Sequence, residues 1–281
     1  MQRLDRKIAM WLLSMSGGSM KIAILLLFAA TAFLSMWISN TATAAMMLPL
    51  ALGMMDHLDR EKDRKTFVFV LLGIAYCASI GGLGTVVGSP PNAIAAKALD
   101  LDFMGWIKMG LPMMLLMLPL MLLSLYVVLR PNLDQRVAMQ TEDIPWTRHR
   151  VMAMLIFLAT AAAWVMSSKI KALFGIANPD TVIALSAAVA VVLFGVAHWT
   201  EVARNTDWGV LMLFGGGIAL SSLLQSSGAS AALGQQVAST FGQAHPLVII
   251  FVVATFIIFL TEFTSNTASA ALANADRKSV V

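Results

Sequence analysis

The property that most restricts the fold of this chain is the length of its segments without a charged residue. Residues 22–55 and residues 66–96 contain no Asp, Glu, Lys or Arg. Over the whole chain 59% of the residues are hydrophobic and 12% are charged, whereas a soluble domain has about 25% charged residues. Water cannot accommodate this much apolar surface, and a bilayer accepts only segments that satisfy their own backbone hydrogen bonds. We therefore expect an all-α integral membrane protein with several passes.

The first charge-free segment, within residues 20–56, is too long for one ordinary pass. At about 1.5 Å per residue it would form a helix of roughly 50 Å, against a hydrocarbon core of about 30 Å. The polar triplet Ser39-Asn40-Thr41 lies near its middle, and basic residues flank both of its ends. The positive-inside rule places both ends in the cytoplasm. The pattern predicts a re-entrant hairpin over 20–56 with its tip at residues 39–41.

The second charge-free segment predicts a broken helix over 66–99. A helical pattern from Phe67 is interrupted by the run Gly81-Gly82-Leu83-Gly84-Thr85-Val86-Val87-Gly88-Ser89-Pro90-Pro91-Asn92. Four Gly and two consecutive Pro cannot continue a helix, and interrupted spans point to binding sites in transporters. The other apolar segments predict spans over 104–129, 151–168, 180–198 and 207–224, with residues 130–150 as a cytoplasmic loop.

An internal repeat relates two distant parts of the chain. A shift of 226 positions aligns residues 33–45, FLSMWISNTATAA, with residues 259–271, FLTEFTSNTASAA. The first copy has basic cytoplasmic flanks, and the second follows the charge-free residues 225–245, so the two copies enter from opposite faces, as in an inverted-topology repeat. The alternative is that Ser, Asn and Thr only help apolar helices to pack. The predicted repeats are 1–129 and 151–281, with a second re-entrant hairpin at 246–275.

The two Ser-Asn-Thr triplets and the run Gly88-Ser89-Pro90-Pro91-Asn92 resemble the divalent anion/sodium symporter family, which carries dicarboxylates, citrate or sulfate. The resemblance implies that sodium ions are bound together with the anion. The positions that match the family's substrate ligands are Ser39, Asn40, Thr41, Ser89, Ser265, Asn266 and Thr267. Those that match its first sodium site are Ser35, Ser39, Asn40 and Gly88. Those that match its second sodium site are Thr261, Thr264 and Asn266.

This site chemistry agrees with the absence of Lys and Arg from both charge-free segments. A bound dianion there must be compensated by cations, by helix N-termini and by neutral hydrogen-bond donors. Hydroxyl, amide and loop carbonyl oxygens can in turn replace the hydration shell of sodium. Glu262 is the one acid beside a predicted tip. It would tune the second cation site, or else it pairs with another segment or lies in water.

We expect sodium-coupled symport of small divalent anions across the cytoplasmic membrane, with C4-dicarboxylates such as succinate as substrates. Sodium-independent anion exchange, proton-coupled transport, and transport of sulfate or citrate on the same scaffold are alternatives. The chain ends soon after the second triplet, before the counterpart of Gly88–Asn92. It therefore resembles the middle of a longer carrier, for which the family implies a homodimer, or an inactive fragment of one.

Other function classes lack the residues they need. The single Cys excludes an internal disulfide and a Cys-based zinc site. The four His lie at predicted span ends, and Ser39 and Ser265 have no nearby His in the sequence, so an enzyme is not expected. The net charge of +4 suits basic membrane flanks and gives no sign of nucleic-acid binding.

Overall fold

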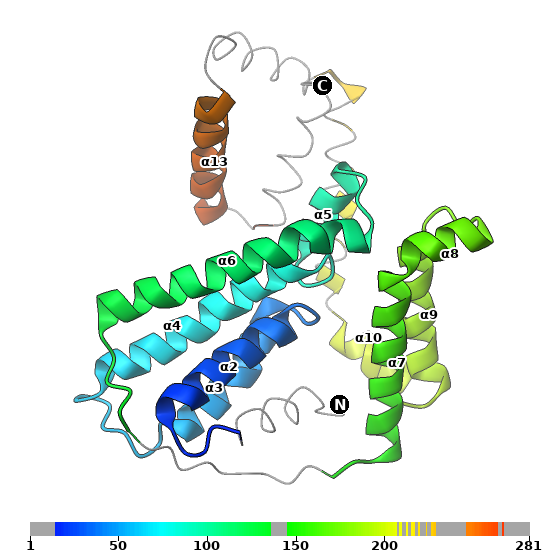
Figure 1. Ribbon diagram of the computed structural model, residues 1–281. Helices are drawn as coiled ribbons and strands as arrows, with labels where there is room; N and C mark the ends of the chain where they lie inside the picture. Colours follow the sequence, from blue (N-terminus) through cyan, green and yellow to red (C-terminus); the bar gives the residue numbers. More distant parts are fainter. Residues whose placement is uncertain are drawn as a thin grey trace. The chain divides into compact units, whose positions relative to one another are not determined.

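The computed structural model describes residues 15–135, 145–206 and 246–263, together with Asn266 and single positions between 208 and 228. The regular elements of this part are helices (Figure 1), in agreement with the predicted all-α membrane protein. Two compact units are present. The first comprises residues up to Ser89 and Leu101–Ala203, and the second comprises Pro90–Asp100 and residues from Arg204 onward.

A helix–turn–helix lies where the first hairpin is predicted. Helix α2 (Met20–Ser35) and helix α3 (Asn40–Met54) are joined by residues 36–39, so the turn ends at Ser39, and the other two residues of the triplet begin α3. Ser39 ends the turn in an extended conformation, and its side chain accepts a hydrogen bond from the Ala42 amide at 3.3 Å. This is N-capping, which explains why α3 starts at Asn40. The depth of the turn in the bilayer stays a prediction.

Helix α4 (Arg64–Gly81) packs closely against α2, beside it in Figure 1. Small residues on α4 permit this approach. A Cβ atom on Gly81 would lie 2.4 Å from the Ala32 carbonyl oxygen, and one on Gly73 would lie 2.1 Å from the Phe28 ring. Lipid tails are as apolar as the helix side chains, so no hydrophobic driving force brings helices together in a bilayer. Apolar helices associate there through close backbone contact at small residues. Cys77 is fully buried on the same helix.

The broken helix is observed at the predicted place. Helix α4 continues into a short 3-10 turn, η1 (Gly82–Gly84), and then stops at Thr85, whose backbone is extended. The chain resumes as α5 (Pro90–Ala98), which belongs to the second unit. The break has a simple cause, because Pro90 and Pro91 offer no amide hydrogen and restrict the residues before them.

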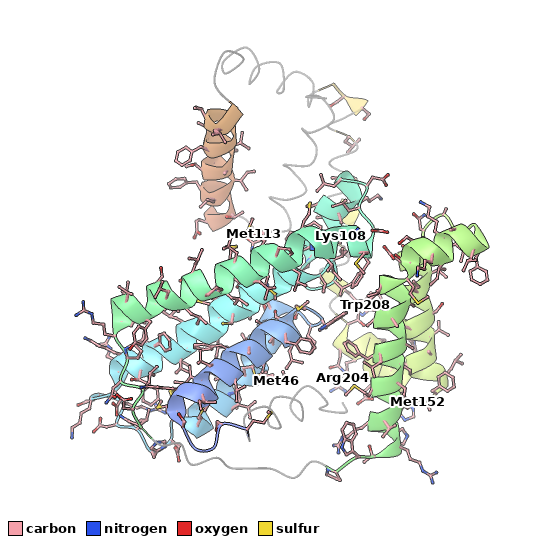
Figure 2. All side chains as sticks on the ribbon, viewed as in Figure 1. Met46, Lys108, Met113, Met152, Arg204 and Trp208 are labelled. Carbon is pink, nitrogen blue, oxygen red and sulfur yellow. The ribbon has the colours of Figure 1, made fainter. Side chains whose placement is uncertain are left out.

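Helix α6 (Phe103–Leu129) is the longest of the described helices and contains two prolines. It packs along α4, but the buried residues it contributes are few: Phe103, Gly110 and Met114. The large apolar side chains of Met113 (labelled in Figure 2) and Leu116 are more than half exposed. Such a surface suits contact with lipid or with other membrane segments.

The residues that follow α6 contact the starts of α2 and α4, so the ends of these three helices are connected. Lys21 at the start of α2 forms an ion pair with Asp134 at 2.5 Å. Thr66 at the start of α4 exchanges hydrogen bonds with the backbone of Asn132 at 3.1 and 3.2 Å. The helix ends that the positive-inside rule assigns to the cytoplasm are therefore joined to one another, as that assignment requires.

The rest of the first unit consists of α7 (Arg148–Val165), α8 (Ser167–Phe174), α9 (Pro179–Leu193) and α10 (Trp199–Asn205). Helices α8 and α9 meet at an angle of 102°. Within the described residues, α4 with η1, α6 and α7 are long and apolar enough to cross a membrane, and the bent α8–α9 pair passes the same test jointly.

The second unit contains α13 (Pro246–Phe263), which coincides with the first arm of the predicted second hairpin. Its exposed side chains are mostly large and apolar, among them Phe251, Phe256 and Phe259. The predicted span over 207–224 lies mostly outside the described residues. So does the second arm of the hairpin predicted over 246–275.

Candidate functional site

The first hairpin tip joins α2, α3 and α4 through one buried hydroxyl. The Ser35 side chain is fully buried, and its Oγ lies 2.8 Å from Asn40 Oδ1 and 2.6 Å from the Ala78 carbonyl oxygen. A hydroxyl has a single hydrogen, so it donates to one of these oxygens at a time. Of the predicted first-site residues, Ser35 and Asn40 are thus brought into direct contact.

Gly88, another of the four residues predicted for the first sodium site, lies against the same tip. A Cβ atom on Gly88 would be 2.5 Å from the Gly82 carbonyl oxygen and 3.0 Å from each of the Ser35 and Met36 carbonyl oxygens. Three backbone oxygens, two from the end of α2 and one from the broken helix, therefore surround this position. The Asn40 side chain lies against Gly82 of the broken helix, since a Cβ on Gly82 would lie 2.4 Å from its Oδ1.

Electrostatics distinguishes the two sides of this tip. The last carbonyl groups of α2 lack helical amide partners and carry the negative end of the helix dipole, which favours a cation. The first amides of α3 carry the positive end of a dipole, which favours an anion. The turn at residues 36–39 places both ends next to each other without any charged side chain.

The other predicted residues of this tip lie beside the contact of Ser35 with Asn40. Ser39 and Thr41 are exposed, and the Ser39 hydroxyl is used as the cap of α3. Ser89 is half-buried and follows Gly88 directly. These three side chains are placed to meet a solute that approaches the start of α3.

Two threonines at this site were missed by sequence reasoning. Thr85 is fully buried, and its hydroxyl donates to the Met36 carbonyl and accepts from the Gly88 amide at 3.1 Å. Thr43 is also fully buried, and within the described residues its hydroxyl has no hydrogen-bond partner. By contrast, Thr31 and Thr160 each donate to the carbonyl four residues earlier. The alignment of Thr43 with Ser269 in the repeat was the one available signal for it.

A group of aromatic rings adjoins the tip. Trp37 stacks edge-on against Phe157 with ring centres 5.1 Å apart and lies 6.3 Å from the Phe103 ring. Phe103 in turn stacks on Trp164 at 5.1 Å. The Asp180 carboxylate accepts a hydrogen bond from the Phe103 amide at 3.0 Å, which connects the start of α9 to the start of α6. These contacts support the tip from the α7–α9 part of the first unit.

The second predicted site is described only in part. Thr261 is half-buried near the end of α13 and donates to the Ile258 carbonyl at 2.8 Å. Glu262 and Asn266 are exposed. The remaining predicted residues, Thr264, Ser265 and Thr267, lie outside the described residues. The second sodium site and the second half of the substrate site therefore stay predictions.

The available ligands are neutral oxygens. Within the described part of the chain, no three His, Cys, Asp or Glu side chains gather as a metal-binding group. Hydroxyl, amide and backbone carbonyl oxygens suit a hard monovalent cation better than they suit zinc, which takes nitrogen and sulfur ligands.

Comparisons with known proteins show the family of the chain. Residues 3–275 match the family model described as citrate transporter. The chain is 52% identical over 279 residues to an uncharacterised transporter of Haemophilus influenzae and 37% identical over 265 residues to one of Methanocaldococcus jannaschii. It is 29% identical over 302 residues to the sodium-dependent dicarboxylate transporter SdcS of Staphylococcus saprophyticus. These matches include 94–96% of the chain, which spans 58–60% of the length of each relative.

Proposed function

The chain belongs to the citrate transporter family, a family of membrane transporters and not of enzymes, and from this premise we propose that it binds and carries small divalent anions together with sodium. It is a multi-pass integral protein of the cytoplasmic membrane. The observation that supports sodium coupling is the convergence of the Ser35, Met36 and Gly82 carbonyl groups around Gly88, beside the contact of the Ser35 hydroxyl with Asn40.

The cation half of the proposal rests on this oxygen-rich contact. Ser35 Oγ, Asn40 Oδ1 and the carbonyl oxygens of Ser35 and Met36 are contributed by one turn of chain, and the Gly82 carbonyl is contributed by the broken helix. A sodium ion at this place exchanges its water ligands for oxygens that are already held near one another. Because no acidic side chain is involved, affinity for a single positive charge is expected to be modest.

The anion half rests on the start of α3. Its first amides, the Asn40 side chain and the exposed hydroxyls of Ser39 and Thr41 can donate hydrogen bonds to a carboxylate. The second carboxylate of the solute would be held in the same way by Ser265, Asn266 and Thr267 of the second tip. Sodium bound beside the first tip lowers the cost of placing a dianion there, so each ligand raises the affinity for the other.

The proposed substrates are C4-dicarboxylates such as succinate, because the relative SdcS is named as a sodium-dependent dicarboxylate transporter. Citrate is the second candidate, since the matching family model is described as citrate transporter. The same hydrogen-bond donors would serve sodium-independent anion exchange and sulfate transport. The exchange alternative differs from symport in needing no sodium. The homodimer implied for a complete carrier of this kind is likewise part of the proposal.

Ligand binding to the purified chain tests the proposal without requiring a full transport cycle. We expect heat of succinate binding in sodium chloride and none in potassium chloride, with citrate and sulfate compared under the same conditions. Asn40→Ala should weaken succinate binding at least tenfold, because it removes a ligand from both halves of the site. Asn178→Ala, on the exposed connection before α9, is the matched control and should bind as the unaltered chain does. Equal succinate binding in both salts would refute sodium coupling and favour anion exchange.

Uptake into proteoliposomes with an imposed sodium gradient then tests transport itself. Sodium-driven accumulation of radiolabelled succinate is the expected result. Its loss in Asn40→Ala, with the protein still inserted in the vesicles, would link the uptake to the first tip. Accumulation by Asn40→Ala equal to that of the unaltered chain would contradict the assignment of this site.

A further inference from the structure

Thr85 occupies an unusual place between the two parts of the first cation site. Its side chain is fully buried, and its backbone is extended where the 3-10 turn η1 ends. The hydroxyl accepts a hydrogen bond from the Gly88 amide at 3.1 Å and donates one to the Met36 carbonyl, 49 positions earlier in the chain. One side chain thus connects the broken-helix loop to the end of α2.

The groups that Thr85 joins are the same ones that surround the proposed cation. The Met36 carbonyl oxygen, which accepts the Thr85 hydrogen, lies 3.0 Å from the position of a Cβ on Gly88, and the Ser35 carbonyl oxygen lies at the same distance. The Gly82 carbonyl belongs to the turn that ends at Thr85. The distance between the oxygens of α2 and those of the loop therefore depends on the Thr85 hydroxyl.

We propose, resting on the sodium site of the proposed function, that Thr85 is a positioning residue that fixes the spacing of these carbonyl oxygens and so determines the affinity for sodium and the discrimination against lithium. Thr85 need not touch the ion for this role. The spacing and field strength of the surrounding carbonyl groups decide which alkali ion is bound best. Oxygens whose spacing is fixed by a hydrogen-bonded bridge are less able to rearrange around the smaller lithium ion.

Substitution by valine tests this role with little change in volume. Thr85→Val keeps the branched shape but removes both side-chain hydrogen bonds. The Met36 carbonyl loses the Thr85 hydroxyl, and the Gly88 amide keeps only its longer contact with the Thr85 carbonyl at 3.4 Å. Loss of one buried hydrogen-bonded group corresponds to about a tenfold change in an equilibrium constant. We expect about tenfold weaker sodium binding in Thr85→Val and a lithium-to-sodium affinity ratio that moves toward lithium. Thr85→Ser, which retains the hydroxyl, should recover most of the sodium response.

Cys77 provides the readout. It is the only cysteine of the chain and is fully buried on α4, next to the Ala78 carbonyl that contacts Ser35. A thiol-reactive fluorophore therefore reports thermal unfolding, and an ion that binds only the folded protein raises the midpoint as its concentration rises. Titrations with sodium and lithium chloride, at constant ionic strength kept with potassium chloride, give the concentration of each ion for half of its maximal effect.

The matched control is Thr31→Val. Thr31 is as fully buried as Thr85, but its hydroxyl donates only within α2, to the Leu27 carbonyl at 2.6 Å. The two variants undergo the same chemical change, so a general loss of stability lowers both midpoints without altering the ion concentration at half effect. We expect Thr31→Val to keep that concentration within about twofold of the unaltered chain, because the ion contacts remain in place.

The possible results separate this inference from the proposed function. A sodium response in Thr85→Val equal to that of Thr31→Val and of the unaltered chain would overturn the role of Thr85 and leave the sodium site intact. An unaltered chain that responds to sodium no more than to potassium would overturn both the site and this inference. A clear sodium response without any succinate binding would refute the proposed anion carrier alone.

Discussion

Replacing Gly88 with alanine is the most direct perturbation of the first cation site. No positive φ angle is found at Gly88, so alanine is compatible with its backbone and only the added methyl group matters. That methyl carbon would lie 2.5 Å from the Gly82 carbonyl oxygen and 3.0 Å from the Ser35 and Met36 carbonyl oxygens. Ordinary carbon–oxygen contacts are about 3.3–3.6 Å. The broken-helix loop must therefore move by about 1 Å, away from the end of α2.

The magnitude follows from this overlap. Inserting a methyl group into a packed place costs about 1–3 kcal/mol, which is about a 5- to 150-fold change in an equilibrium constant at 1.4 kcal/mol per factor of ten. The obstructing atoms are backbone oxygens, which cannot rotate away as a side chain can. We expect Gly88→Ala to weaken sodium binding within this range, measured by the sodium concentration that gives half-maximal succinate binding.

Gly53→Ala is the control for this experiment. A Cβ on Gly53 would meet nothing within 4 Å, and this glycine lies inside α3, where alanine favours the helix by up to about 1 kcal/mol. Its sodium dependence should equal that of the unaltered chain. If Gly88→Ala also retained the unaltered sodium dependence while binding succinate normally, the carbonyl groups around Gly88 would not be the cation ligands.

Three further variants examine other parts of the chain. Asn266→Ala should weaken succinate binding about as strongly as Asn40→Ala does, since the repeat assigns both residues to one solute; calorimetry showing an effect of only the first-tip variant would contradict a two-tip site. Gly81→Ala should lower the free energy of unfolding by about 1–3 kcal/mol, because its methyl group would meet the Ala32 backbone. Gly73→Ala should cost less, because only the end of the Phe28 ring obstructs it. Thermal midpoints reported by Cys77 would show the difference, and a midpoint of Gly81→Ala equal to that of the unaltered chain would argue against close α2–α4 packing.

Much of the helical architecture could be predicted from local sequence. The turn between α2 and α3, residues 36–39, meets the tip predicted at 39–41 only at Ser39. The break after α4 lies within the predicted Gly- and Pro-rich run, and α6 begins within one residue of the predicted span. These features depend on charge, hydropathy, proline and glycine, each of which acts within a few residues. The bend of 102° between α8 and α9 was not predicted, although Gly175 ends α8 in a left-handed conformation and Pro179 begins α9.

Within the candidate site, the family resemblance indicated Ser35, Asn40 and Gly88, and the structure brings these three residues together. Neither charge patterning nor the repeat pointed to Thr85, because a threonine after several glycines is unremarkable until its partner is known. That partner, the Met36 carbonyl, lies 49 positions away. Contacts of this kind follow from the packing of α2 on α4.

The sequence by itself determined that this chain must lie in a membrane, because the transfer of charged and polar groups into lipid is costly at every position along the chain. It also indicated a turn beside Ser39 and a helix break within residues 81–92, because proline and glycine act locally. Only the tertiary structure decided which oxygens face one another at the first tip. Hydrogen bonds and carbonyl groups act over a few ångströms, and only the packing of α2, α3 and α4 brings Ser35, Asn40, Thr85 and Gly88 within that range.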